Sequence, residues 1–157
     1  MTLPSYRHGF PNDRPRATIL LVEDEPFVRE ATCSILQNAG FEVLPAEDGH
    51  DAMTVYEERE WAIDLVITDM VLPGRTGEQL AEDLRQRSPE LMVLITSGYG
   101  NLDYDAFEDD HQSNQVAGKS RTYFLAKPYS RKTLIDKIEQ MLGTGAVALS
   151  RPAKQAG

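Results

Sequence analysis

Four clusters of polar residues in this 157-residue chain could do chemistry together, although they lie far apart in the sequence. Each follows a short apolar run, and in chain order they are Glu23-Asp24-Glu25, Asp69, Thr96-Ser97 and Lys127-Pro128. Carboxylates brought together repel one another unless a cation lies among them, and Mg2+ commonly binds through carboxylates, waters and phosphate oxygens. A lysine and a hydroxyl supply donors for phosphoryl oxygens, and a carboxylate can be the nucleophile. These residue types therefore favour Mg2+-assisted phosphoryl transfer to an aspartate.

The apolar runs before these clusters predict β-strands. They cover residues 18–22, 41–44, 65–68, 91–95 and 123–126, and such continuous runs suit strands buried on both faces of a parallel sheet. Apolar residues at helical spacing predict helices at 27–38, at 50–58, around 80–84 and after Ser130. Gly40 is well placed to end the first helix and Ser130 to cap the last. This alternation predicts helices on both faces of the sheet, with the polar clusters meeting at its carboxyl edge.

The chain divides into one domain and two tails. Residues 1–15 carry three prolines and predict a disordered N-terminal extension, residues 16–143 are expected to form the domain, and residues 144–157 predict a flexible C-terminal tail. The stretch from Tyr99 to Thr122 is rich in acids and has no sustained apolar stripe. It predicts a long acidic loop with at most a short helix.

Charge and composition restrict the class of protein. The formal net charge of −9 disfavours direct binding of nucleic acid through the bulk surface, because a phosphate backbone repels an acidic chain. The single cysteine, Cys33, excludes an internal disulfide and any multi-cysteine zinc site. No apolar stretch approaches the roughly 20 residues of a membrane helix, and the N-terminus does not read as a secretory signal. A cytoplasmic location is the expectation.

Four motifs, in order and at the predicted strand ends, resemble the receiver domain of bacterial response regulators. They are LLVEDEP at 20–26, DLVITDMVLPGRTG at 64–77, LITSGY at 94–99 and FLAKPY at 124–129. The chain is most similar to receivers associated with hybrid sensor kinases, and the resemblance covers about residues 17–143. It implies a flavodoxin-like, doubly wound five-stranded parallel sheet with helices on both faces and an irregular or shortened fourth helix.

The resemblance assigns the central roles to five positions. Asp69 matches the phosphoacceptor, and Lys127 matches the lysine that contacts the phosphoryl group. Glu23 and Asp24 match the acidic pair that holds Mg2+ together with Asp69, and Met70 matches the residue whose main-chain carbonyl completes the metal shell.

Further positions match the conformational switch of the family. Ser97 matches the hydroxyl that moves onto the phosphoryl group, because its spacing from Asp69 fits the family register; Thr96 is the alternative. Pro128 matches the companion of the lysine, often in a cis peptide bond. Phe124 matches the aromatic switch residue.

The function implied is that of a phosphoacceptor in a phosphorelay. The expected partners are a histidine kinase or histidine phosphotransfer protein and an unidentified downstream protein, with no membrane and no direct nucleic acid; homodimer formation stays open. A stand-alone receiver is the first expectation and an excised domain of a hybrid kinase the second. Val71 and Tyr99 border the path of an attacking water and do not readily orient it, which predicts slow hydrolysis of the acyl phosphate.

Two rival functions stay open at the level of sequence. A small phosphatase with an aspartyl nucleophile would want a second acid two residues after the nucleophile, where this chain has Val71. A receiver-like interaction module that takes no phosphate would not need the intact set of acids and lysine. We therefore expect no conventional enzyme activity beyond the protein's own phosphorylation and dephosphorylation.

Overall fold

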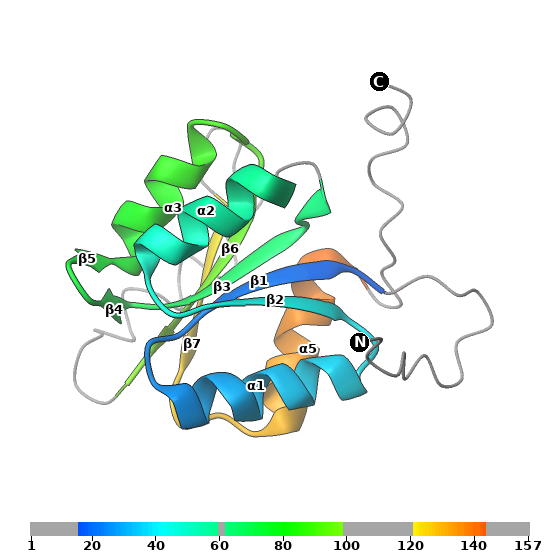
Figure 1. The fold of residues 1–157 in the computed structure, drawn as a ribbon. Helices are drawn as coiled ribbons and strands as arrows, with labels where there is room; N and C mark the ends of the chain where they lie inside the picture. The colour runs from blue at the N-terminus through cyan, green and yellow to red at the C-terminus, as the bar shows by residue number, and fades with distance from the viewer. Residues whose placement is uncertain (1–15, 60–61, 99–120, 144–157) are drawn as a thin grey trace, which may run out of the picture.

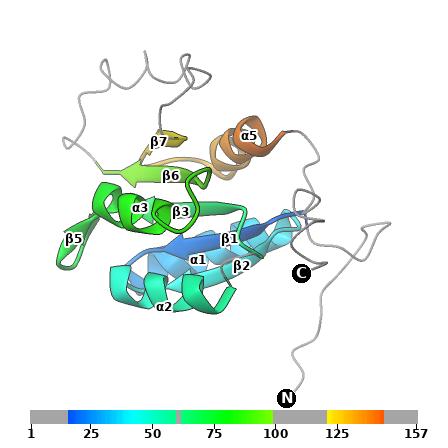
Figure 2. The ribbon, with the colours of Figure 1, turned by 90° about the horizontal axis from the view of Figure 1, so that it is seen from above.

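A five-stranded parallel sheet forms the centre of the computed structural model, which describes residues 16–59, 62–98 and 121–143. Its strand order is β2-β1-β3-β6-β7, and all four pairings are parallel (Figure 2). The strands are β1 (Thr18–Val22), β2 (Glu42–Ala46), β3 (Leu65–Asp69), β6 (Met92–Ser97) and β7 (Thr122–Ala126). This is the strand order of the flavodoxin-like doubly wound fold, so the predicted fold class is confirmed.

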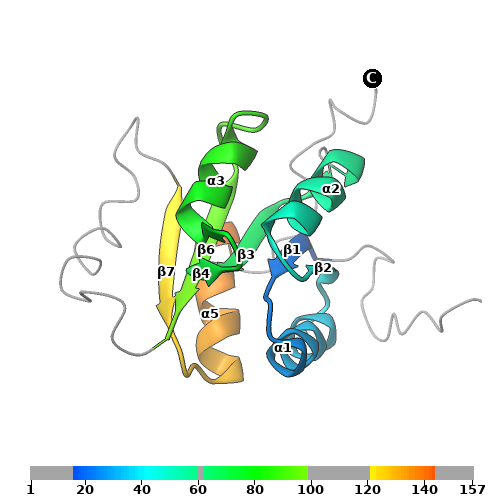
Figure 3. The same cartoon turned by 60° about the vertical axis from the view of Figure 1, so that its left-hand side comes forward.

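Four described helices cover the two faces of the sheet. α1 (Pro26–Asn38) and α5 (Arg131–Leu142) lie on one face, and α2 (Gly49–Arg59) and α3 (Gly77–Arg85) lie on the other (Figures 1 and 3). Each face holds its own apolar core, and alternate strand residues enter the two cores. Leu20 and Val66 pack toward α2 and α3, whereas Leu21 and Ile67 pack toward α1 and α5. The continuous apolar runs of the sequence are explained by this burial on both faces.

The helix ends follow from local sequence. Gly40 has a positive φ of 97° after α1, and its N–H donates to Gln37 O while that of Phe41 donates to Leu36 O. This is a Schellman motif, which glycine favours because it has no Cβ. Ser130 caps α5 as predicted, since its hydroxyl accepts from the N–H of Thr133.

Strand β2 is longer than the sequence predicted, because it continues through Pro45 to Ala46. Within β2, the main chains of Glu42 and Ala46 hydrogen-bond toward β1. Because successive strand residues direct their main-chain groups to opposite sides, the main chain of Pro45 faces away from β1. β2 is an edge strand, and on that side a missing N–H breaks no ladder bond.

A two-stranded antiparallel hairpin lies between β3 and α3 and was not predicted from the sequence. Its strands are β4 (Val71–Leu72) and β5 (Arg75–Thr76), with Gly74 in the turn at a φ of 78°. Strands of two residues are too short for any apolar periodicity to show.

Three predicted segments lie outside the described residues: the N-terminal extension at 1–15, the C-terminal tail at 144–157, and the irregular fourth helix within 99–120. These stay predictions. Within the described ranges, none of the helices combines the length and the apolar character needed to span a bilayer.

Candidate functional site

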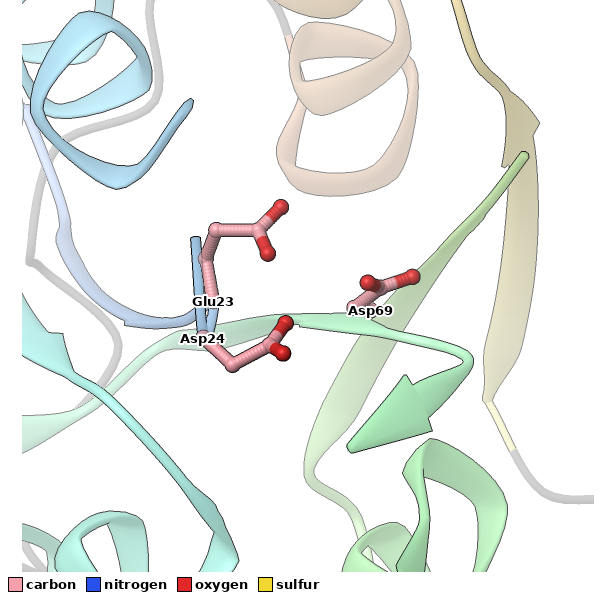
Figure 4. A group of neighbouring side chains, drawn as sticks. All are labelled: Glu23, Asp24 and Asp69. Carbon is pink, nitrogen blue, oxygen red and sulfur yellow. The ribbon is translucent and has the colours of Figure 1, made fainter. Parts of the chain in front are cut away.

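Three carboxylates meet at the carboxyl edge of the sheet. Glu23 and Asp24 follow β1, and Asp69 ends the neighbouring strand β3. One carboxylate oxygen from each lies within 4.8 Å of the others. Figure 4 shows Glu23 and Asp24 reaching from the loop after β1 toward the end of β3, where Asp69 lies. Glu23 is buried, Asp69 is half-buried and Asp24 is exposed, so the cluster opens to solvent on one side.

Lys127 brings a positive charge into this cluster from the end of β7. Its Nζ lies 2.6 Å from Glu23 Oε1 and 3.7 Å from Asp69 Oδ2. Burial lowers the pKa of Lys127, but the hydrogen bond to Glu23 and the charges of Asp69 and Glu23 outweigh it, so the pKa lies above its ordinary value. The side chain therefore keeps its charge at neutral pH. The peptide bond between Lys127 and Pro128 is cis, in the form that the resemblance led us to expect.

The donor set of the cluster fits a hard divalent cation. Its oxygen ligands would be the carboxylates of Glu23, Asp24 and Asp69, and Mg2+ prefers oxygen. The Met70 carbonyl accepts the N–H of Gly77 at 2.7 Å and keeps a second lone pair for a further partner. Three carboxylates and one ammonium leave a formal charge of −2, which a divalent cation balances.

The connection from β3 to α3 holds Asp69 in place through a close backbone contact. Thr76 and Gln79 form a capping box that starts α3, which makes Gly77 the first helical residue. A Cβ on Gly77 would lie 2.5 Å from the carbonyl oxygen of Asp69 and 3.0 Å from Cγ2 of Thr68. Only a glycine lets the helix start this close to the main chain of Asp69.

Sequence reasoning missed this role of Gly77. It used residues 64–77 only as a motif of the family and gave Gly77 no role of its own. The signal that could have found it is the Thr76 and Gln79 capping box. That pair puts a glycine at the first position of a helix, where no local rule favours one.

Two candidate hydroxyls end β6, and both are buried. The hydroxyl of Thr96 lies 3.4 Å from the carbonyl of Thr68 on the neighbouring strand, and that of Ser97 lies 3.2 Å from the carbonyl of the adjacent Gly98. The main chain of Ser97 also accepts the N–H of Lys127 at 2.7 Å. Among the described residues, the Ser97 hydroxyl bonds only to the adjacent Gly98, so it is the freer of the two to turn toward a new partner.

The remaining predicted positions are placed as follows. Phe124 is half-buried on β7 and packs against the core beneath α2 and α3. Val71 is 58% exposed on β4, two residues beyond Asp69. Tyr99 lies outside the described residues, so its predicted place beside the site stays a prediction.

Comparison with known proteins identifies the family. Residues 19–139 match the family model described as the response regulator receiver domain. The chain belongs to this family. As a receiver, it is 35% identical over 126 residues to the sensor kinase CckA of Brucella abortus and 29% identical over 131 residues to the sensory transduction protein RegX3 of Mycolicibacterium smegmatis.

Solved receivers share its fold. The receiver domain of the hybrid histidine kinase CckA matches with a TM-score of 0.64 and 33% identity, covering 80% of this chain and 99% of that one. A receiver from Clostridium thermocellum matches with a TM-score of 0.66 and 26% identity, covering 80% and 93%. The similarity to receivers of hybrid kinases expected from the motifs is thus confirmed.

The curated relatives are longer than the matched region. The match covers 80% of this chain but 12% of CckA, and 82% of this chain but 52% of RegX3. The similarity to these relatives is therefore confined to their receiver regions.

Proposed function

We propose that this receiver takes a phosphoryl group onto Asp69 from a phosphohistidine of a histidine kinase or histidine phosphotransfer protein. The observation that carries the proposal is the convergence of Asp69, Glu23 and Asp24 within 4.8 Å, with Lys127 Nζ 3.7 Å from Asp69 Oδ2. In this setting Asp69 supplies a nucleophilic oxygen, and the neighbouring Lys127 supplies the positive charge that stabilises a phosphoryl group.

The step is a displacement at phosphorus. An oxygen of Asp69 forms a bond to phosphorus as the phosphorus–nitrogen bond of the donor breaks, and the electron pair stays on the imidazole nitrogen, which takes a proton from solvent. Lys127 neutralises charge on the transferred phosphoryl oxygens. Glu23, Asp24, Asp69 and the Met70 carbonyl would hold Mg2+, which supplies further charge neutralisation when bound.

The phosphorylated form differs from the free form in what it offers the Ser97 hydroxyl. We expect Ser97 to leave its contact with Gly98 and donate to a phosphoryl oxygen, with Thr96 as the alternative. Phe124 then repacks at the edge of its core, and the altered surface is read by a downstream protein. The equilibrium shifts only as far as these new contacts favour one state.

Further features belong to the same proposal. We expect a cytoplasmic protein, since its phosphodonor is cytoplasmic. We expect the aspartyl phosphate to persist, because the exposed Val71 offers no group to orient an attacking water. Val71 also stands where an aspartyl-nucleophile phosphatase would have its second acid. We therefore expect no turnover of generic phosphate esters.

Intact mass after incubation with acetyl phosphate and Mg2+ tests the proposal. The wild type should gain one phosphoryl group, and Asp69→Asn should gain none. Asp136→Asn is the matched control, because Asp136 pairs with Lys132 on the exposed side of α5. An equal gain in Asp69→Asn would move the phosphoacceptor elsewhere. No gain in the wild type, together with no spectral response to beryllofluoride, would leave only an interaction module.

A further inference from the structure

The end of β1 leaves a main-chain carbonyl that strand pairing does not satisfy. The N–H of Glu23 still donates to Ala46 O of β2 at 3.0 Å, and in a parallel pair the C=O of the same residue points to the same neighbour. β2 ends at Ala46, so the next ladder donor is missing. Arg29 supplies it instead, and its guanidinium donates to Glu23 O at 2.7 Å.

Arg29 reaches this carbonyl from the first turns of α1. Its own N–H donates to Glu25 O at 2.8 Å, so its backbone is fixed by the helix. The N-cap residue of α1, Glu25, makes no side-chain cap bond. The half-buried Arg29 side chain therefore links the helix back to the acidic loop.

The other polar groups of Glu23 already have partners. Its Oε1 accepts from Lys127 at 2.6 Å, and its Oε2 accepts from the N–H of Glu25 at 3.2 Å. With Arg29 on the carbonyl, Glu23 is held at its N–H, its C=O and both carboxylate oxygens.

Asp24 has no such set of contacts. It is exposed, and among the described residues its carboxylate takes part in no hydrogen bond or ion pair. Its place is set by its backbone, and the planar peptide unit that joins Glu23 to Asp24 contains both the Glu23 carbonyl and the Asp24 Cα. A hydrogen bond to the Glu23 carbonyl therefore fixes the orientation of this peptide plane, and with it the position of the Asp24 Cα from which the side chain extends.

We propose that Arg29 is a positioning residue for the cation site: by holding the Glu23 carbonyl it orients Asp24 toward Glu23 and Asp69. This inference rests on the proposed Mg2+ site, to which it adds a residue that is not a ligand. The charge of Arg29 acts in the opposite direction, because a cation near the site repels Mg2+. Positioning and charge therefore predict effects of opposite sign when Arg29 is replaced.

Calorimetric titration of the full chain with MgCl2 separates the two effects. Arg29→Met removes both the charge and the donor, and should weaken Mg2+ binding roughly tenfold, about 1.4 kcal/mol. Arg29→Lys, which retains a charged donor, should recover part of the affinity, and Arg29→Gln should bind more weakly than Arg29→Lys. Arg59→Met is the matched control, because Arg59 pairs with Glu42 on an exposed surface, and it should bind as the wild type does.

NMR of the metal-free proteins gives a readout that needs no cation. The amide signals of Asp24 and Glu25 should shift and exchange faster with solvent in Arg29→Met, and stay unchanged in Arg59→Met. Thermal unfolding of each variant shows which of them are folded. Should Arg29→Met not fold, the order of Arg29→Lys and Arg29→Gln decides.

Two results would overturn the positioning role: unchanged or tighter Mg2+ binding in Arg29→Met, or unmoved Asp24 and Glu25 amides in that variant. A wild type that binds no Mg2+ would be a different failure, that of the metal site in the proposed function. The metal-free NMR comparison would still decide whether Arg29 orients the loop.

Discussion

Replacing Gly77 with alanine sets two effects of known sign against each other. Gly77 is the first residue of α3, and in a helix alanine is more favourable than glycine by roughly 0.5–1 kcal/mol. From helix propensity alone, Gly77→Ala should stabilise the protein. The packing around this residue argues the reverse.

The added methyl group would lie 2.5 Å from Asp69 O and 3.0 Å from Thr68 Cγ2. The first of these is a backbone atom at the end of a central strand, so it cannot turn away as a flexible side chain would. Overpacking of a tight site costs roughly 1–3 kcal/mol. Subtracting the propensity gain leaves a net destabilisation between zero and roughly 2.5 kcal/mol; at the midpoint, about 1.2 kcal/mol, a domain of this size would lose about 5 °C in melting temperature.

The same displacement should also reach the chemistry. The Gly77 N–H donates to Met70 O at 2.7 Å, so a shift of α3 moves both Asp69 and the carbonyl expected to face the cation. We expect slower phosphorylation of Gly77→Ala by acetyl phosphate and weaker Mg2+ binding, measured at a temperature where it is folded.

Gly98→Ala is the control for this prediction. A Cβ on Gly98 would meet no atom of the described residues within 4 Å, and its φ lies outside the left-handed region, so alanine there should change the melting temperature little. If Gly77→Ala melts at or above the wild-type temperature, the close approach of α3 to the Asp69 carbonyl is wrong. The steric account of the site would then be refuted.

Three further predictions concern charges. In denaturant unfolding, Arg16→Met should lower the free energy of unfolding by roughly 1–3 kcal/mol, because the side chains of Arg16 and Glu139 in this ion pair are only 14% and 28% exposed. Arg59→Met should lower it by less than about 1 kcal/mol, because the ion pair of Arg59 with Glu42 is exposed. The raised pKa of Lys127 contributes stability that is complete below pH 10.5 and is lost as the pH rises through the higher pKa of the folded protein. The difference in melting temperature between wild type and Lys127→Met should therefore shrink above pH 10.5. Asp24→Asn should weaken Mg2+ binding at least about tenfold while leaving the metal-free melting temperature equal or higher, because it relieves repulsion among carboxylates.

Most of the fold could be predicted from the sequence because its strands are buried on both faces. A run such as residues 18–22 is apolar throughout, and in the structure all five of its residues are buried. Polar residues directly after such runs must lie at the carboxyl edge of a parallel sheet. The sequence alone therefore places Glu23, Asp69 and Lys127 at one edge of the sheet.

The rest of the site depends on contacts that no spacing encodes. The guanidinium of Arg29 reaches a carbonyl six residues earlier, and a sequence shows arginine there only as one more polar residue on a helix. Gly77 matters because of a backbone atom eight residues before it, brought close by the unpredicted hairpin of β4 and β5. The choice of Glu23 as the nearest partner of Lys127 likewise depends on side-chain reach, which strand order does not fix.

The unequal distances from Lys127 to its two acids link the cation to the phosphoryl group. Nζ lies 2.6 Å from Glu23 and 3.7 Å from Asp69, so in the metal-free protein the lysine is engaged mainly with a residue expected to ligate the cation. A divalent cation held by Glu23, Asp24 and Asp69 would weaken the pull of these carboxylates on Lys127 and leave its ammonium group free to pair with phosphoryl oxygens on Asp69. Because binding couplings are reciprocal, a phosphoryl group or its analogue on Asp69 must then raise the affinity for the cation by the factor by which the cation favours that group. Lys127→Met should reduce this mutual factor, since the side chain that would move between the two charges is gone.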